Sequence, residues 1–305
     1  MVRASRSDSM RGGGRAAGGP ATPYVPKGFR WTNRLLDRAR VLAPLENAGF
    51  AIGFVFQALT AVPLTLRRYR GETMRTITDM TWGRGSVIVG GGTVPMLIVL
   101  GIAMGAGVGI QGFTTLDLIG LGPVTGVVSA FANTRELAPI AAAVGFAAQA
   151  GCRMTAEIGS MRISEEIDAI ESLGLRSIPF VVSTRVIAGA IAIVPTFLIA
   201  LILSYLACDT VVVLLHGQAG GVYEHYFFQF TSGYDVLAAV IKILVFGVAV
   251  ILIHCYYGFF ASGGPEGVGI ASGRAVRASF VAIIALDMVS TLLLWGVNSS
   301  IEFPG

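Results

Sequence analysis

Residues 85–116 read GSVIVGGGTVPMLIVLGIAMGAGVGIQGFTTL, a run of 32 residues without one charged side chain. An α-helix rises about 1.5 Å per residue, so about 20 apolar residues cross the ~30 Å hydrocarbon core of a bilayer. The run is therefore long enough to span a membrane, and it predicts an integral membrane protein.

Four further stretches have the same apolar character, with few charged residues in each. The five spans predicted in this way cover residues 87–110, 123–152, 183–207, 237–259 and 278–297. The second is longer than a minimal span, so we expect it to tilt or to extend into the cytoplasm. The pattern predicts an all-α integral membrane protein with a five-span domain over residues 85–300.

The composition excludes several other classes of protein. Charged residues make up 13% of the chain, against about 25% in a typical soluble domain. The mean hydropathy is +0.72. These values argue against an ordinary soluble enzyme, a nucleic-acid-binding protein and a disordered chain.

The basic residues are distributed unevenly along the chain. Residues 1–84 hold 14 of the 22 lysines and arginines, whereas residues 111–122 and 208–236 hold none. Cytoplasmic loops of membrane proteins carry the excess of Lys and Arg. We therefore expect the N-terminus and residues 153–182 and 260–277 in the cytoplasm, and the C-terminus outside. This placement of the basic charge also argues against a nucleic-acid partner.

Residues 48–66 form a sixth uncharged run, AGFAIGFVFQALTAVPLTL, which either spans the membrane or lies on it. A sixth span with a cytoplasmic N-terminus would place five arginines outside: Arg67, Arg68, Arg70, Arg75 and Arg84. We therefore favour an amphipathic interfacial helix, within residues 46–84, on the inner membrane surface. Residues 1–45 are basic, and we expect them to be largely disordered.

Motifs for catalysis or metal binding are scarce. The three cysteines, Cys152, Cys208 and Cys255, border or lie in apolar segments, so we expect buried free thiols. His254 is predicted to be packed and hydrogen-bonded rather than a metal ligand. No lysine follows a glycine, so the phosphate-binding loop of ATPases is absent. We expect no cofactor on this chain, and any ATP-driven work requires another subunit.

Gly101, Gly105 and Gly109 recur every four residues in the first span. Such a stripe lets another helix backbone approach closely. It predicts helix packing within the chain or, alternatively, a mobile seam along a lipid path.

Arg135, Glu136 and Asp287 lie within predicted spans. Charged groups at membrane depth are costly, and they usually face a partner or a wet cavity. Arg135 and Glu136 are adjacent and do not easily share a helix face. We therefore expect Arg135 to pair with Asp287 across helices, with Glu136 as the competing partner. A structural ion pair and a role in substrate binding or gating both remain open.

The segment after the second span predicts a short cytoplasmic helix at about residues 163–173. Isoleucines recur at three-to-four spacing, and Ser164 is a candidate cap with acidic residues in the first turn. Gly174 can end the helix. The segment is either a solvated linker or a transmission helix that docks into a soluble motor, and we favour the second. The candidate coupling residues are Arg162, Ser164, Glu165, Glu166, Asp168 and Glu171.

Residues 135–174, RELAPIAAAVGFAAQAGCRMTAEIGSMRISEEIDAIESLG, strongly resemble the central signature of the MlaE/YrbE permease family. The segment LDMVSTLLLWG around Asp287 resembles the last helix of that family. IQGF, YEHYF and HCYYGFFASGGPEGVG look most like the B-type YrbE permeases of actinobacterial Mce operons. The sequence departs from the family at residues 149–152, QAGC, where many relatives have an arginine.

The resemblance implies a non-catalytic permease subunit of an ABC-type Mce lipid transporter in the cytoplasmic (inner) membrane. The implied partners are a second, A-type YrbE permease, a cytoplasmic ABC ATPase dimer that binds ATP and Mg²⁺, and MCE-domain proteins outside. The implied cargo is a fatty acid, mycolic acid, sterol or phospholipid, imported with ATP hydrolysed by the partner. The alternative is a membrane scaffold that anchors MCE proteins without transporting lipid.

Overall fold

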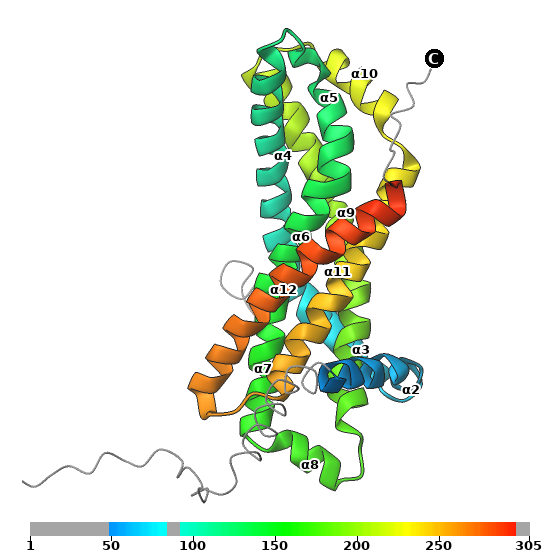
Figure 1. Ribbon diagram of the computed structural model, residues 1–305, viewed down its shortest axis with the longest axis vertical. Coiled ribbons are helices and arrows are strands. Elements are labelled where there is room, and N and C mark those ends of the chain that lie inside the picture. The colour runs from blue at the N-terminus through cyan, green and yellow to red at the C-terminus, as the bar shows by residue number, and fades with distance from the viewer. Residues whose placement is uncertain (1–48, 84–91, 297–305) are drawn as a thin grey trace, which may run out of the picture. The chain divides into compact units, whose positions relative to one another are not determined.

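Among the residues described by the computed structural model, five helical stretches are long and apolar enough to cross a membrane (Figure 1). They cover Thr93–Asp117, Gly122–Ile163, Ile178–Leu215, Gly233–Phe259 and Gly264–Trp295. The structure describes residues 49–83 and 92–296. The predicted basic region 1–45, the start of the first predicted span and the last residues of the chain lie outside the described residues. The prediction of an all-α membrane protein with five spans is confirmed.

The N-terminal helices form the element that the sequence predicts to be interfacial, which we call the interfacial element. Helix Gly49–Thr60 and α2 (Val62–Arg68) meet at a bend of 41°, and α3 (Arg70–Trp82) follows. Pro63 lies in the first turn of α2, where it lacks the N–H that would continue the preceding helix. Figure 1 shows α2 lying across the direction of the long spans. The bend and this direction distinguish the pair from a straight sixth span.

Two hydrogen bonds fasten these helices to the start of the third span. Ser183 Oγ donates to the carbonyl of Ala58 over 2.7 Å. Thr65 Oγ1 lies 3.2 Å from the carbonyl of Pro179, to which it donates. The interfacial element is therefore joined to the helix bundle through buried polar contacts.

The second and third spans are built from several helical pieces. The second consists of η1 (Gly122–Val124), α5 (Thr125–Val128), the π-helix η2 (Ser129–Leu137), α6 (Ala138–Phe146), the π-helix η3 (Ala147–Gly151) and α7 (Cys152–Ile163). The third consists of the π-helix η4 (Ile178–Ser183), α9 (Thr184–Thr210) and the π-helix η5 (Val211–Leu215). The first, fourth and fifth spans are the single helices α4 (Thr93–Asp117), α11 (Gly233–Phe259) and α12 (Gly264–Trp295). The short helices α8 (Glu166–Ser172) and α10 (Gly220–Phe230) connect the spans.

Several helices extend beyond the predicted spans. The fifth begins at Gly264 rather than at residue 278, so most of the predicted loop 260–277 is helical. The predicted outer segment 208–236 contains α10. Hydropathy identifies only the part of a helix that is apolar enough to lie in hydrocarbon. Backbone hydrogen bonding does not depend on apolar side chains, so a helix can extend beyond its apolar part into water.

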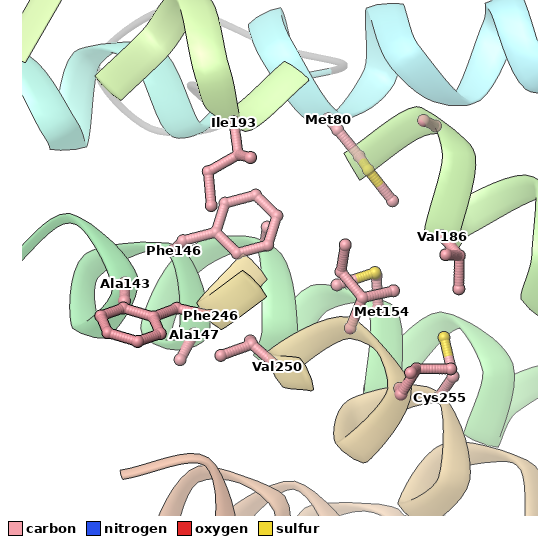
Figure 2. Packing of buried hydrophobic residues seen from close by; sticks show 14 of the residues in the cluster. Met80, Ala143, Phe146, Ala147, Met154, Val186, Ile193, Phe246, Val250 and Cys255 are labelled. Carbon is pink, nitrogen blue, oxygen red and sulfur yellow. The ribbon is translucent and has the colours of Figure 1, made fainter. Parts of the chain in front are cut away.

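The core lies where α6, α9 and α11 meet (Figure 2). Ile193 of α9 points toward Phe146 of α6, and Phe246 and Val250 of α11 lie beside them. All four side chains are buried. Because lipid is as apolar as these residues, close van der Waals packing rather than removal from water stabilises the contact.

The predicted packed role of His254 is confirmed. Its side chain is buried, and its Nδ1 lies 2.8 Å from Thr155 Oγ1, which joins α11 to α7. Cys208 and Cys255 are buried free thiols, and Cys152 is a partly buried one.

Candidate functional site

Charged side chains from the second, fourth and fifth spans form one connected group. We call it the intramembrane charge cluster, and its members are Arg135, Glu136, Asp235, Lys242 and Asp287. Charges at this depth persist where they are paired and hydrogen-bonded. The cluster is therefore the main candidate site within the spans.

Lys242 of α11 is at the centre of the cluster, and its side chain is fully buried. Its Nζ lies 2.7 Å from Asp287 Oδ1 and 3.0 Å from Glu136 Oε2. The same ammonium group donates to the carbonyl of Arg135 over 2.7 Å and to Thr291 Oγ1 over 2.9 Å. Thr291 in turn donates to Glu136 Oε1 over 2.8 Å. One buried cation thus connects three spans.

Arg135 forms the second ion pair of the cluster. Its guanidinium Nε lies 3.0 Å from Asp235 Oδ1, and its Nη2 donates to Asp235 Oδ2 over 3.1 Å. The indole N–H of Trp295 donates to the same carboxylate over 2.7 Å. The guanidinium carbon also lies 4.4 Å from the ring centroid of Phe131. The Arg135 side chain is 23% exposed, so this cation is less enclosed than Lys242.

The local helix geometry explains how adjacent residues reach different partners. Arg135 and Glu136 lie in the π-helix η2, where the wider turn reduces the angle between successive side chains. Asp235 and Lys242 are seven residues apart on α11, which places them on one helix face about two turns apart. Each residue of the Arg135–Glu136 pair therefore meets an opposite charge on the same helix.

The predicted pairing of Arg135 with Asp287 is wrong, and so is the alternative of Arg135 with Glu136. Asp287 binds Lys242, and Arg135 binds Asp235. Lys242 lies inside the predicted fourth span 237–259 but was not among the charged residues considered there, and Asp235 lies in the predicted outer segment 208–236. Because α11 already begins at Gly233, Asp235 joins Lys242 within the fourth span.

The predicted coupling segment folds as a short helix between the second and third spans. Helix α8 covers Glu166–Ser172, a shorter range than the predicted 163–173. Ile167 is buried in the core, whereas the side chain of Leu173 is 77% exposed. Gly174 follows with a positive φ of 76°, as expected for a residue that ends a helix.

Polar contacts fasten both ends of α8 to the spans. Arg162 Nη1 of α7 lies 2.8 Å from Asp168 Oδ1 of α8. At the other end, Ser177 Oγ donates to the carboxylate of Glu171. Three of the four acidic residues of the segment are thus engaged within the chain, because Glu166 also accepts a hydrogen bond from Ser164 over 3.0 Å.

The predicted capping role of Ser164 is wrong. Ser164 ends α7, and its hydroxyl lies within hydrogen-bond distance of both Ser160 O and Glu166 Oε1. The residue before α8 is Glu165, which has a left-handed backbone with φ of 60°. The chain turns sharply at Glu165, so the helix starts two residues after Ser164. Glu165 and Glu166 are both exposed.

The glycine stripe of α4 packs against α9. A Cβ atom on Gly105 would lie 1.9 Å from the carbonyl oxygen of Ser204, and one on Gly101 would lie 2.4 Å from that of Ala200. At Gly109 the nearest atoms belong to Val211, at 3.0 Å. The stripe therefore serves helix packing within the chain, and α9 occupies the seam that a lipid path would need.

A second polar cluster lies where α3, α7 and α9 meet, and the sequence pattern did not predict it. Arg153 Nε lies 2.9 Å from Glu157 Oε1, and Arg185 Nη2 lies 3.5 Å from Glu157 Oε2. Arg153 also donates to the carbonyl of Asp79 over 2.9 Å. These contacts join the interfacial element to the second and third spans.

The chain is similar to known permeases over most of its length. A family model described as Permease MlaE matches residues 83–293. A probable ABC transporter permease protein of Rickettsia bellii (strain RML369-C) is 29% identical over 220 residues, which cover 69% of this chain and 82% of that protein.

Two relatives have more specific names. The intermembrane phospholipid transport system permease protein MlaE of Haemophilus influenzae is 28% identical over 210 residues, covering 68% of this chain and 80% of that protein. The chloroplastic protein TRIGALACTOSYLDIACYLGLYCEROL 1 of Arabidopsis thaliana is 30% identical over 198 residues, which cover 63% of this chain and 55% of that protein. Because the family match spans more than half of the chain and the five-span fold agrees with it, this multi-pass membrane protein belongs to the MlaE permease family.

Proposed function

We propose that this chain is the non-catalytic permease subunit of an ABC-type Mce lipid transporter, driven by ATP that a partner ATPase hydrolyses with Mg²⁺. The observation that carries the proposal is α8, which is anchored on one side and exposed on the other. Ile167 is buried in the core of the chain, whereas Glu165, Glu166 and Leu173 face outward. An exposed apolar tip beside acidic residues suits a groove in a protein partner.

The attachment of α8 supports a role in transmission. Arg162 ties it to the end of the second span, and Ser177 ties it to the start of the third. A partner that displaces α8 would therefore move both spans together. ATP supplies the driving force because it favours one state of the ATPase and hence one position of α8.

The cargo is a lipid, and the name of the Haemophilus relative favours a phospholipid as the first candidate. Fatty acids, mycolic acids and sterols are the other candidates for an Mce system, in the direction of import. Arg135 offers a partly exposed guanidinium between Phe131 and Trp295, with ring centroids at 4.4 Å and 5.2 Å. Asp235 takes the Nε and Nη2 side of this guanidinium, and arginine carries five N–H donors in all, so the remaining N–H groups of Arg135 are the candidate contact for an anionic headgroup.

The proposed assembly places residues 1–84 and α8 in or at the cytoplasm of the inner membrane, and the C-terminus outside. Residues 1–45 form a basic tail, residues 46–84 the interfacial region, and residues 85–300 the permease domain. A second permease chain of the A type completes the membrane core, and MCE-domain proteins stand outside. The unequal distribution of basic residues supports this orientation.

Co-purification with a candidate partner ATPase, followed by ATP hydrolysis measurements in lipid vesicles, tests the proposal. A permease is expected to retain the ATPase and to make its hydrolysis rate depend on added phospholipid. A scaffold would assemble with MCE-domain proteins but leave hydrolysis independent of lipid. Assembly without such dependence, at normal protein levels, would favour the scaffold.

A further inference from the structure

Two arginines on α12 stand apart from the ion pairs described above. Arg274 and Arg277 are exposed, and neither has an ion pair or hydrogen bond to any residue that the structure describes. They are three residues apart, so they lie one turn from each other on the same side of the helix. The nine residues of α12 directly after Arg277, residues 278–286, carry no charge.

Arg274 lines an open groove between the end of α11 and the start of α12. The groove has a volume of about 380 Å³, and ligand pockets are typically about 300–1,000 Å³. Its walls include Tyr256, Tyr257, Phe260 and Ile270. The groove thus combines one positive charge with two phenol groups and an apolar wall.

The aromatic wall of the groove continues into the interfacial element. Phe54 of helix Gly49–Thr60 packs against Tyr256 with ring centroids 5.6 Å apart, and against Phe260 at 5.7 Å. An interfacial helix lies at the level of the lipid headgroups, and tyrosine is enriched at the same level. With the interfacial placement proposed above, these contacts put the groove at the membrane surface and Arg277 at the border of the hydrocarbon.

We infer that this groove binds the phosphate of an anionic phospholipid from the cytoplasmic leaflet, at a site separate from the intramembrane charge cluster. The guanidinium groups of Arg274 and Arg277 would bind the phosphate oxygens, and a tyrosine hydroxyl would donate to them. The acyl chains would lie along the exposed apolar face of α12, which includes Val281 and Ile284. The cytoplasmic leaflet carries the anionic lipids that such a site selects.

The inference uses the proposed orientation of the chain but not the proposed transport. The test measures lipid binding to the purified full-length chain in detergent, without ATPase or ATP. Native mass spectrometry, with phosphatidylglycerol or phosphatidylcholine as the probe, gives the affinity for each. We expect tighter binding of phosphatidylglycerol.

The double variant Arg274→Gln/Arg277→Gln is expected to lose about 25-fold in affinity for phosphatidylglycerol, because each arginine near an anionic lipid contributes about a factor of five. The matched control Arg67→Gln/Arg75→Gln removes two exposed arginines elsewhere in the basic part of the chain. It is expected to stay within about twofold of the wild type, since such distant surface charges are largely screened. Equal losses in both variants would show diffuse surface attraction and overturn the site.

A further variant tests the groove itself. Ile270 is 49% exposed and lines the groove, so Ile270→Trp fills it while leaving both arginines in place. The variant is expected to weaken phosphatidylglycerol binding by about tenfold, as for the loss of a major contact. Unchanged binding would show that the groove is not used. Displacement of the lipid by millimolar inorganic phosphate would instead identify a site for free phosphate and contradict the lipid assignment.

Discussion

The ammonium group of Lys242 lies 2.7 Å from the carboxylate of Asp287, which joins α11 to α12 within their membrane-spanning parts. The same group also contacts Glu136 of the second span. A fully buried cation is tolerated only where carboxylates and hydrogen bonds replace water. The arrangement of these three spans therefore depends on the ionic contacts of Lys242.

Replacing Lys242 by Met should destabilise the protein strongly, because it leaves Glu136 and Asp287 beside each other without their cation. Removing one member of a buried ion pair costs about 3–5 kcal/mol. The free energy of unfolding, measured by SDS titration in mixed micelles, should fall by that amount. Arg162→Gln is the control, since it breaks an exposed ion pair with Asp168, and exposed pairs contribute about 0–1 kcal/mol.

A second substitution distinguishes the observed pairing from the one expected on sequence. Asp287→Leu alone should destabilise the protein, and Lys242→Met should restore part of the loss in the double variant. Arg135→Leu should add its own loss to that of Asp287→Leu, because Arg135 pairs with Asp235. Recovery with Arg135→Leu instead of Lys242→Met would contradict the structure of the cluster.

The glycine stripe offers a matched pair of substitutions on one helix. Gly105→Ala places a methyl group against the backbone of Ser204 and should cost about 1–3 kcal/mol, as for overpacking. At Gly107 a Cβ atom meets nothing within 4 Å, so Gly107→Ala should be neutral or slightly stabilising. The apparent melting temperature in detergent, measured for both variants, should fall for Gly105→Ala and stay at or slightly above the wild-type value for Gly107→Ala. Equal melting temperatures would show that α4 does not pack on α9 through this stripe.

The exposed acidic residues of α8 are the ones expected to contact the ATPase. Glu165→Lys/Glu166→Lys should reduce retention of the ATPase or lipid-dependent hydrolysis at least several-fold, while leaving membrane insertion unchanged. Opposing the positive helix N-terminus costs only about 0.3–1 kcal/mol per residue, which does not unfold the protein. Glu224→Lys reverses an exposed charge on α10 and is the control. Wild-type association and coupling in the double reversal would exclude this acidic face from the interface.

Cysteine labelling tests the orientation in intact cells, in a variant without the native cysteines. A cysteine at position 164 should resist a membrane-impermeant maleimide, whereas one at position 221 should react. Both positions are exposed, so burial does not explain a difference between them. Labelling at position 164 would reverse the proposed topology.

The number of spans followed from the sequence because hydrocarbon imposes a length requirement on every uncharged run. The partners of the charged residues did not follow, because pairing depends on which helices are neighbours. Asp235 and Lys242 are seven residues apart, which is the spacing of two residues on one face of a helix. This spacing was the signal in the sequence for a charged face on α11, and in the structure that face contacts Arg135 and Glu136.

The coupling segment illustrates a different limit. Its isoleucine spacing and Gly174 predicted a short helix, and α8 is that helix. The position of its start depended on the left-handed backbone of Glu165, a conformation that residues other than glycine adopt only rarely. The sequence around Ser164 therefore predicted a helix N-cap at Ser164, whereas α8 begins directly after Glu165.

The most direct test of the transport account is the movement of a labelled phospholipid in proteoliposomes that contain this chain with the proposed second permease, ATPase and MCE-domain proteins. The account predicts transfer that requires ATP and is lost in Glu165→Lys/Glu166→Lys but retained in Glu224→Lys. ATP hydrolysis at a normal rate with no lipid transfer, or transfer that is the same without ATP, would contradict it.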